Sequence, residues 1–261
     1  MLALGSLASA PSAMAQSAEP DHAKHSVTAI AETQELSQDR GSMRSARIEY
    51  KFDDGDTTVL VAPTIGVRSA PQRKDTSLGI DATIYQEWSD VVSSRTHVFV
   101  SENKPVFAHL DLAQDLTARI ASHTTLTAGF RWAEYHGGNE VTFVSLGIRQ
   151  YFKGGSVAYR VTRVNPDRQD AFYAHLINLT INDAHGRGKT QLWASTGAAS
   201  LARAQFDENF AANDHAVMVQ RTQPLSKDLA LIALAGVSSY ATPTGRYTGV
   251  NLGIGLTADL N

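Results

Sequence analysis

Apolar and polar residues alternate along most of this chain with a period of two. Within residues 77–88, Leu78, Ile80 and Ile84 fall on one face, and Asp81 falls on the other among small polar residues. Successive side chains of a β-strand point to opposite faces, so each such segment has one apolar and one polar face. The pattern therefore predicts an all-β protein.

Turns rich in Gly, Asn and Asp separate the alternating segments, because these residues adopt the positive φ values of tight hairpins. The pattern predicts about fourteen strands, at 25–36, 43–52, 57–68, 77–88, 95–101, 105–117, 123–135, 140–152, 156–164, 171–182, 189–199, 215–223, 228–241 and 246–260. A twelve-stranded barrel without the first two segments is the alternative. Both counts are even, as in single-chain bacterial barrels.

The length of the strands favours a membrane over a soluble sandwich. Turns recur about every 12–15 residues, whereas soluble sandwiches turn about every 8–12. The longest apolar run, 229–237, is too short for a membrane helix but long enough for a tilted strand. In hydrocarbon every backbone polar group must be paired, so this many strands must form a closed, antiparallel up-and-down transmembrane barrel. We expect the apolar faces to meet lipid, represented by Leu78/Ile80, Leu110/Leu112 and Leu252/Ile254. In the alternation, Val106 and Ala108 share the face of Leu110 and Leu112.

Aromatic residues gather near the predicted strand ends. Amphipathic rings favour the headgroup level of a bilayer, which predicts two aromatic girdles. The girdle candidates are Trp88, Trp132, Tyr135, Tyr151, Tyr240 and Tyr247. The alternative is that these rings belong to a core.

Charged residues lie on the polar faces in mid-strand, which predicts a polar lumen. The lumen-facing candidates are Asp81, Asp111, Arg131, Arg149 and Arg160. Three arginines on consecutive strands would repel, so we expect acidic partners and some water, with low or no conductance. An arginine ladder lining an anion-favouring pore is the alternative.

Composition excludes several kinds of chemistry. The net charge of −3 gives no basic surface for nucleic acid, and the absence of Cys removes disulfides, thiol catalysis and Cys-ligated metals. His109 and Asp111 are too far apart along a strand for a direct bond. The acidic run 53–56 lacks the spacing of a calcium loop and predicts a hairpin. We expect no catalytic residue, no metal and no cofactor.

The N-terminal residues predict export. Residues 1–15 are small and apolar and end in an Ala-x-Ala pattern, which is typical of a signal peptide. We expect a short periplasmic segment at 16–24 and the barrel domain at 25–261. The strand order then places the long connection 200–214 outside the cell and the tight turns 53–56 and 153–155 in the periplasm.

Several stretches resemble one known family. Residues 46–59 (ARIEYKFDDGDTTV) are similar to an early hairpin of the YaiO-type outer-membrane barrels, and 246–256 (RYTGVNLGIGL) to their closing strand. Residues 106–161 are similar to the central portion, including Gly129-Phe130-Arg131 and the Tyr151–Gly154 turn. The resemblance implies an outer-membrane barrel that contacts outer-membrane lipid and is inserted by the barrel-assembly machinery. It implies no established activity.

Three hypotheses follow. The first is a non-catalytic outer-membrane barrel with a structural or narrow-pore role. The second is a barrel enzyme that modifies envelope lipid or polysaccharide. A His with a hydroxyl or carboxylate partner at the top of a strand would favour it. The third is a soluble periplasmic β-sandwich that binds a ligand, which an open pair of sheets would establish.

Overall fold

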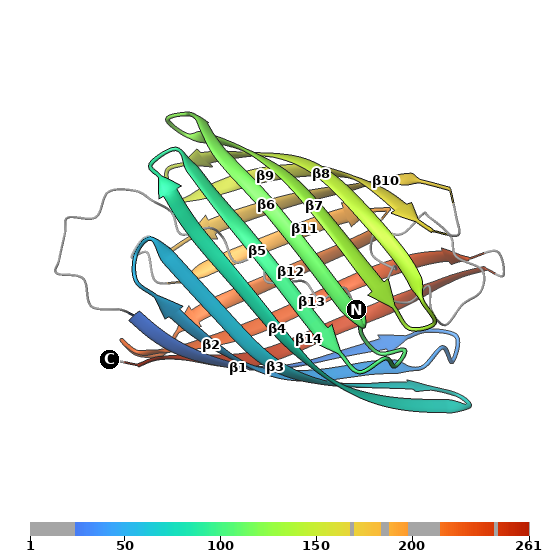
Figure 1. Ribbon diagram of the computed structural model, residues 1–261. Helices are drawn as coiled ribbons and strands as arrows, with labels where there is room; N and C mark the ends of the chain where they lie inside the picture. Colours follow the sequence, from blue (N-terminus) through green and yellow to red (C-terminus); the bar gives the residue numbers. More distant parts are fainter. Residues whose placement is uncertain (1–23, 168–169, 184–187, 198–214, 243–244, 261) are drawn as a thin grey trace.

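The chain forms one closed barrel of antiparallel strands (Figure 1). The computed structural model describes residues 24–167, 170–183, 188–197, 215–242 and 245–260. They form β1 (Lys24–Leu36), β2 (Ser42–Asp53), β3 (Thr57–Ala70), β4 (Arg73–Ser89), β5 (Val92–Ser101), β6 (Leu110–Ala121), β7 (Thr124–Tyr135), β8 (Asn139–Phe152), β9 (Gly155–Pro166), β10 (Phe172–Asn182), β11 (Lys189–Thr196), β12 (His215–Pro224), β13 (Leu229–Thr242) and β14 (Gly245–Leu260). The predicted fourteen-stranded barrel is confirmed, and the twelve-stranded and sandwich alternatives are wrong. The expected signal peptide and the connection 200–214 lie outside the described residues.

Pairing of the first strand with the last closes the barrel. β1 and β14 are in register from His25 opposite Leu260 to Leu36 opposite Gly249. Gly255 of β14 allows the close approach, because a Cβ there would lie 2.7 Å from the carbonyl oxygen of Ala29. β1 begins and β14 ends at the same end of the barrel, at the left of Figure 1. We call this the periplasmic end, since bacterial barrels keep both termini there.

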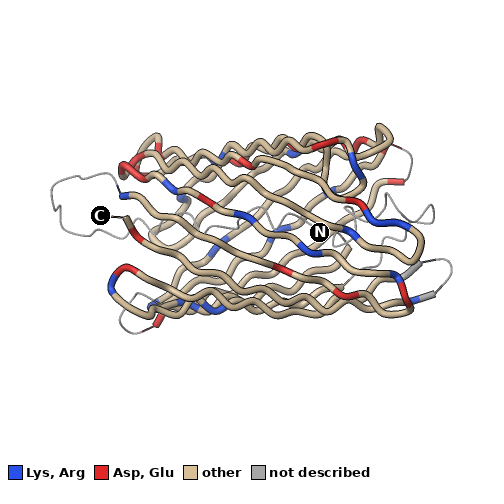
Figure 2. The backbone as a smooth tube through the Cα atoms, turned by 90° about the horizontal axis from the view of Figure 1, so that it is seen from below, with Lys and Arg blue, Asp and Glu red and all other residues tan. Residues whose placement is uncertain are grey.

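The apolar faces point outward, as the alternation predicts. Leu78, Ile80, Leu112 and Leu252 are exposed, and Ile254 is 62 % exposed. Polar residues alternate with them on the inward faces, where they are buried or half-buried. Figure 2 shows charged positions at both ends of the barrel and along some strands, between long uncharged stretches. Among the described residues there is no helix long and apolar enough to cross a membrane.

The predicted strand 105–117 is wrong at its start. β6 begins only at Leu110, and residues 102–109 form a connection that folds into the extracellular mouth. We call residues 102–109 the mouth segment. Val106, expected to face lipid with Ala108, is 1 % exposed, and Ala108 is also buried. Pro105 explains in part why no strand forms here, because it has no N–H to donate to a neighbouring strand.

Phe107 occupies the space that a glycine leaves on β3. A Cβ on Gly66 would lie 2.3 Å from the Phe107 ring, so only glycine accommodates the ring at this position. Met43, Phe99, Val106 and Phe107 form one buried cluster, and the Phe99 and Phe107 rings meet edge to face at 5.6 Å. An apolar cluster from β2, β5 and the mouth segment therefore lies at the extracellular end of the lumen.

The outward assignment of β14 predicts the effect of a buried charge. Replacing Ile254 with Arg should cost about 2–4 kcal/mol of folding free energy, because this face would meet the bilayer midplane. Thr257→Arg is the matched control, since Thr257 faces inward, where its hydroxyl oxygen lies 2.8 Å from that of Thr28. Folding into liposomes under denaturant titration measures both. Equal losses would contradict the assignment of faces.

Candidate functional site

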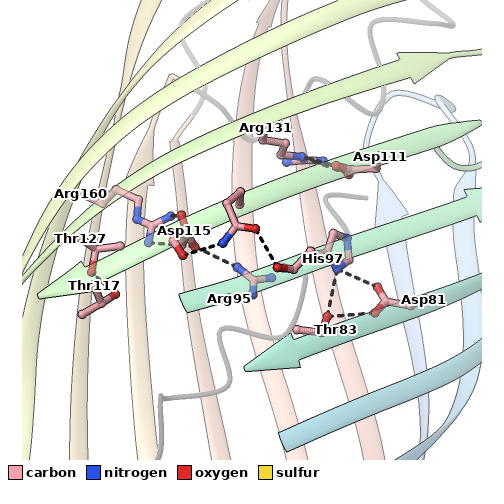
Figure 3. Close-up of polar contacts among 12 residues, drawn as sticks. Asp81, Thr83, Arg95, His97, Asp111, Asp115, Thr117, Thr127, Arg131 and Arg160 are labelled. Carbon is pink, nitrogen blue, oxygen red and sulfur yellow. Dashed lines mark hydrogen bonds and ion pairs between the residues drawn. The ribbon is translucent and has the colours of Figure 1, made fainter. Parts of the chain in front are cut away.

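One wall of the lumen carries an ion-paired ladder (Figure 3). Arg131 on β7 donates from Nε to both oxygens of the Asp111 carboxylate on β6, at 2.8 and 3.0 Å. The guanidinium also lies 4.7 Å from the centre of the Phe143 ring on β8. Asp111 is buried, so its charge requires this bidentate partner. The pair joins two adjacent strands on the inside of the barrel.

A second carboxylate, Asp115, is shared by two arginines. Arg95 on β5 donates to it at 3.3 Å, and Arg160 on β9 at 3.4 and 3.5 Å. The Asp115 side chain reaches toward β9 across Gly129 on β7. A Cβ on Gly129 would lie 2.1 Å from an Asp115 oxygen, so only a glycine leaves room for this crossing.

The remaining predicted lumen charges have different surroundings. Arg149 donates to the hydroxyl of Ser156 at 2.9 Å. Asp81 accepts a hydrogen bond from the Thr83 hydroxyl at 3.3 Å and lies 3.5 Å from Nδ1 of His97. The structure therefore brings Asp111 together with Arg131, but Arg149 contacts no carboxylate among the described residues.

Sequence reasoning missed three members of this wall: Arg95, His97 and Asp115. All three line the lumen cavity. Asp115 lies an even number of residues from Asp111 on β6, so both side chains face the same side of the strand. Arg95 and His97 face the same side of β5 for the same reason. Extending the alternation along these two strands would have identified them.

His97, Thr83 and Asp81 contain the groups of a hydrolase triad but not its geometry. The Thr83 hydroxyl, at 3.1 Å, and the Asp81 carboxylate both approach the same imidazole nitrogen, Nδ1. A catalytic triad needs the acid on one nitrogen and the nucleophile on the other. Thr83 is also completely buried. Among the described residues no three His, Asp or Glu side chains group closely enough to hold a metal.

The opposite wall of the lumen is nearly uncharged. Within the described parts of β10–β13, the inward positions carry no Arg, Asp or Glu, and Lys189 at the periplasmic end is their one charge. Leu176, Trp193, Met218 and Leu234 face the interior there. Between the two walls lies a cavity of about 280 Å³. Its lining is thus charged on one side and apolar on the other.

Hydrogen bonds hold the mouth segment in place. Glu102 accepts from the Leu78 amide and from Lys104, both at 3.0 Å, and these bonds lower the pKa of the Glu102 carboxyl from its ordinary value. His109 donates from Nδ1 to the Ser101 carbonyl at 2.7 Å. The His136 ring, in the β7–β8 turn, lies 3.0 Å from the Asn103 carbonyl oxygen. The segment is therefore tied to three neighbouring elements.

The predicted aromatic girdle is wrong at several positions. Tyr135 and Tyr247 are buried, Tyr240 is 2 % exposed, and the Tyr240 and Tyr247 rings stack at 4.8 Å. These three rings alternate with the outward residues and so face inward, as Tyr151 does on the same face as Arg149. Trp88 is exposed on the outside, and Trp132, also on the outward face, donates from Nε1 to Glu140 at 3.0 Å. Proximity to a strand end indicates the depth of a ring in the membrane, whereas its odd or even position along the strand decides whether it faces lipid or the lumen.

Closure, lipid-type outer faces and a polar lumen define the class of this protein: it is an integral outer-membrane β-barrel. A model of the YaiO membrane beta barrel domain matches residues 24–202, and the chain belongs to that family. The resemblance found in the sequence is thereby confirmed.

Solved structures with the same architecture are distant in sequence. A mutant of TodX, a monoaromatic hydrocarbon channel, matches with TM-score 0.60 and 10 % identity, over 93 % of this chain and 91 % of that chain. A bacterial polysaccharide outer membrane secretin matches with TM-score 0.55 and 7 % identity, over 90 % and 98 %. The Acinetobacter baumannii protein Omp33 matches with TM-score 0.51 and 8 % identity, over 91 % and 99 %. At these identities the likeness establishes the fold alone.

The ion-paired ladder predicts strong coupling between Asp111 and Arg131. Asp111→Ala should cost on the order of 3 kcal/mol of folding free energy, because it leaves a guanidinium unpaired inside the barrel. Replacing both residues, with Arg131→Met added, should cost much less than the sum of the two single changes. A double-mutant cycle in liposomes measures the coupling. Additive losses would show that the two side chains do not depend on each other.

Proposed function

We propose that this protein is a non-catalytic outer-membrane barrel with a narrow lumen that is closed to ions at its extracellular mouth in the resting state. The burial of the mouth segment carries this proposal. Phe107 is 7 % exposed and packs against Gly66 and Phe99 inside the barrel. An apolar constriction of this kind opposes the passage of hydrated ions.

The charges of the lumen support a narrow passage. Arg131 is neutralised by Asp111, and Arg95 and Arg160 share Asp115. Charges that pair between strands fill space and cross-link the wall, whereas a wide anion pore would present free guanidinium groups to water. Arg149 is the exception, because its described hydrogen bond goes to a neutral hydroxyl.

The absence of catalysis is part of the proposal. The best candidate for chemistry, His97, meets both its hydroxyl and its carboxylate partner through one nitrogen, and the Thr83 hydroxyl is buried. With both partners at Nδ1, the imidazole cannot accept the Thr83 proton on one nitrogen while Asp81 orients it through the other. Contact with outer-membrane lipid, export through the N-terminal segment and insertion by the barrel-assembly machinery belong to the same proposal.

Planar-bilayer recording tests the closed mouth. The unmodified protein should show little or no steady conductance. Changing both Val106 and Phe107 to Ser should raise the conductance several-fold, because polar side chains hydrate the constriction. Phe130→Ser is the control, since Phe130 is exposed on the outside of β7 and should leave conductance unchanged. A large, stable, anion-selective conductance in the unmodified protein would contradict the proposal.

A further inference from the structure

The two walls of the lumen cavity differ in chemistry. Strands β5–β9 supply the arginine ladder, and strands β10–β13 supply Leu176, Trp193, Met218 and Leu234. Met218 lies across from Gly236, where a Cβ would come within 2.6 Å of the Met218 side chain. Such a cavity is amphipathic, and pockets of this kind orient small ligands by a few polar groups against an apolar surface.

The charged wall carries more positive than negative charge. Its ionised groups are Arg95, Arg131, Arg149, Arg160, Asp111 and Asp115. Once Arg131 and Asp111 have paired, the single carboxylate of Asp115 faces both Arg95 and Arg160. Arg149 of β8 lies two residues from Gly147, which is opposite Arg160 of β9, and it adds to the excess. Glu32 of β1 also lines the cavity, away from these strands, and Glu49 and Asp81 lie on the inward faces of β2 and β4 with Arg47 of β2. The surplus positive charge is therefore local to β5–β9.

Two buried donors of the cavity lining have no acceptor. The Nε of Arg95 and the Nε1 of Trp193 make no hydrogen bond, and Trp193 is 7 % exposed. Burying a donor without a partner costs free energy, and a ligand carboxylate that accepts from the Nε of Arg95 recovers that cost on the charged wall. Arg95 belongs to the charged wall and Trp193 to the apolar wall, so the two donors flank the cavity. The Arg95–Asp115 contact of 3.3 Å is long for an ion pair, which leaves this guanidinium available to a second carboxylate.

We propose that the lumen cavity binds a small amphipathic carboxylate, with its carboxylate at Arg95 and Arg160 and its hydrocarbon part against Trp193, Met218 and Leu234. The size of the cavity sets the scale of the ligand. An apolar cavity of about 150 Å³ holds benzene, so about 280 Å³ fits a ligand of roughly twice that size. This inference goes beyond the proposed function, because a barrel closed to ions can still hold a ligand inside.

Trp193 provides the reporter for a binding experiment. Changing Trp88 and Trp132 to Phe leaves Trp193 as the sole tryptophan of the chain. The refolded protein is titrated with 3-phenylpropanoate while Trp193 emission is recorded, and we expect a saturable change. The uncharged 3-phenylpropanamide should bind at least tenfold more weakly, and acetate, which lacks the hydrocarbon part, should cause no saturable change.

Variants of two arginines on one strand assign the carboxylate site. Arg160→Gln should weaken binding of 3-phenylpropanoate at least tenfold. Arg163→Gln, on the outward face of β9, should leave it unchanged. Arg95→Gln gives a second, independent loss. The heat-dependent gel shift of an intact barrel verifies that each variant is folded before its titration is compared.

Three results would overturn the inference. They are no saturable change with folded protein, equal binding of the amide and the carboxylate, and unchanged binding in folded Arg160→Gln and Arg95→Gln. The closed mouth is tested by conductance without ligand, and carboxylate binding is tested by Trp193 emission. Either proposal can therefore fail without the other.

Discussion

The requirement that every backbone polar group be hydrogen-bonded inside a membrane governs this structure. A β-strand meets that requirement only when both of its edges are paired, so the last strand must return to the first. Here β1 and β14 pair along almost their whole length, from His25 to Leu36 on one side. The glycine at position 255 lets the two strands approach. Without this contact, the edges of β1 and β14 would be unpaired in lipid.

Closure has a chemical consequence for the residues on the polar faces. With the apolar faces turned to lipid, half of the side chains must share a limited interior, and their charges must find partners there. On β5–β9 Asp111 pairs with Arg131 of the adjacent strand, and Asp115 reaches across Gly129. On the described parts of β10–β13 the inward side chains are apolar or neutral instead, except for Lys189 at the periplasmic end. The lumen is therefore asymmetric, and Val106 and Phe107 of the mouth segment are buried at its extracellular end.

Much of the fold could be predicted from alternation, because the period of two determines both the strand and its faces. The limit of the method is visible at residues 105–109. There the apolar residues continue the alternation of β6, but the backbone has left the sheet, and alternation cannot tell a strand from an extended segment folded inward. Contacts between residues distant in sequence, above all between Phe107 and Gly66, determine that this segment folds inward.

The candidate site was predictable in part. Parity places Asp111 and Arg131 on inward faces, and the register between β6 and β7 brings them together only in the folded barrel. Asp115 was accessible to the same reasoning, but its two arginine partners lie on β5 and β9, so no local pattern links them. The tyrosines at 135, 240 and 247 show the opposite limit, since nearness to a strand end indicates the depth of a ring in the membrane but not the face on which it lies.

Disulfide cross-linking between β1 and β14 tests closure most directly, because the chain has no cysteine of its own. Ala31 and Ile254 are opposite each other in the register of these strands, and Leu256 is two residues out of that register. With Ala31→Cys combined with Ile254→Cys, the membrane-inserted protein should form an intramolecular disulfide under mild oxidation, and the Ala31→Cys/Leu256→Cys pair should form little. Efficient cross-linking of the out-of-register pair, or of neither pair in folded protein, would contradict the closed fourteen-stranded barrel.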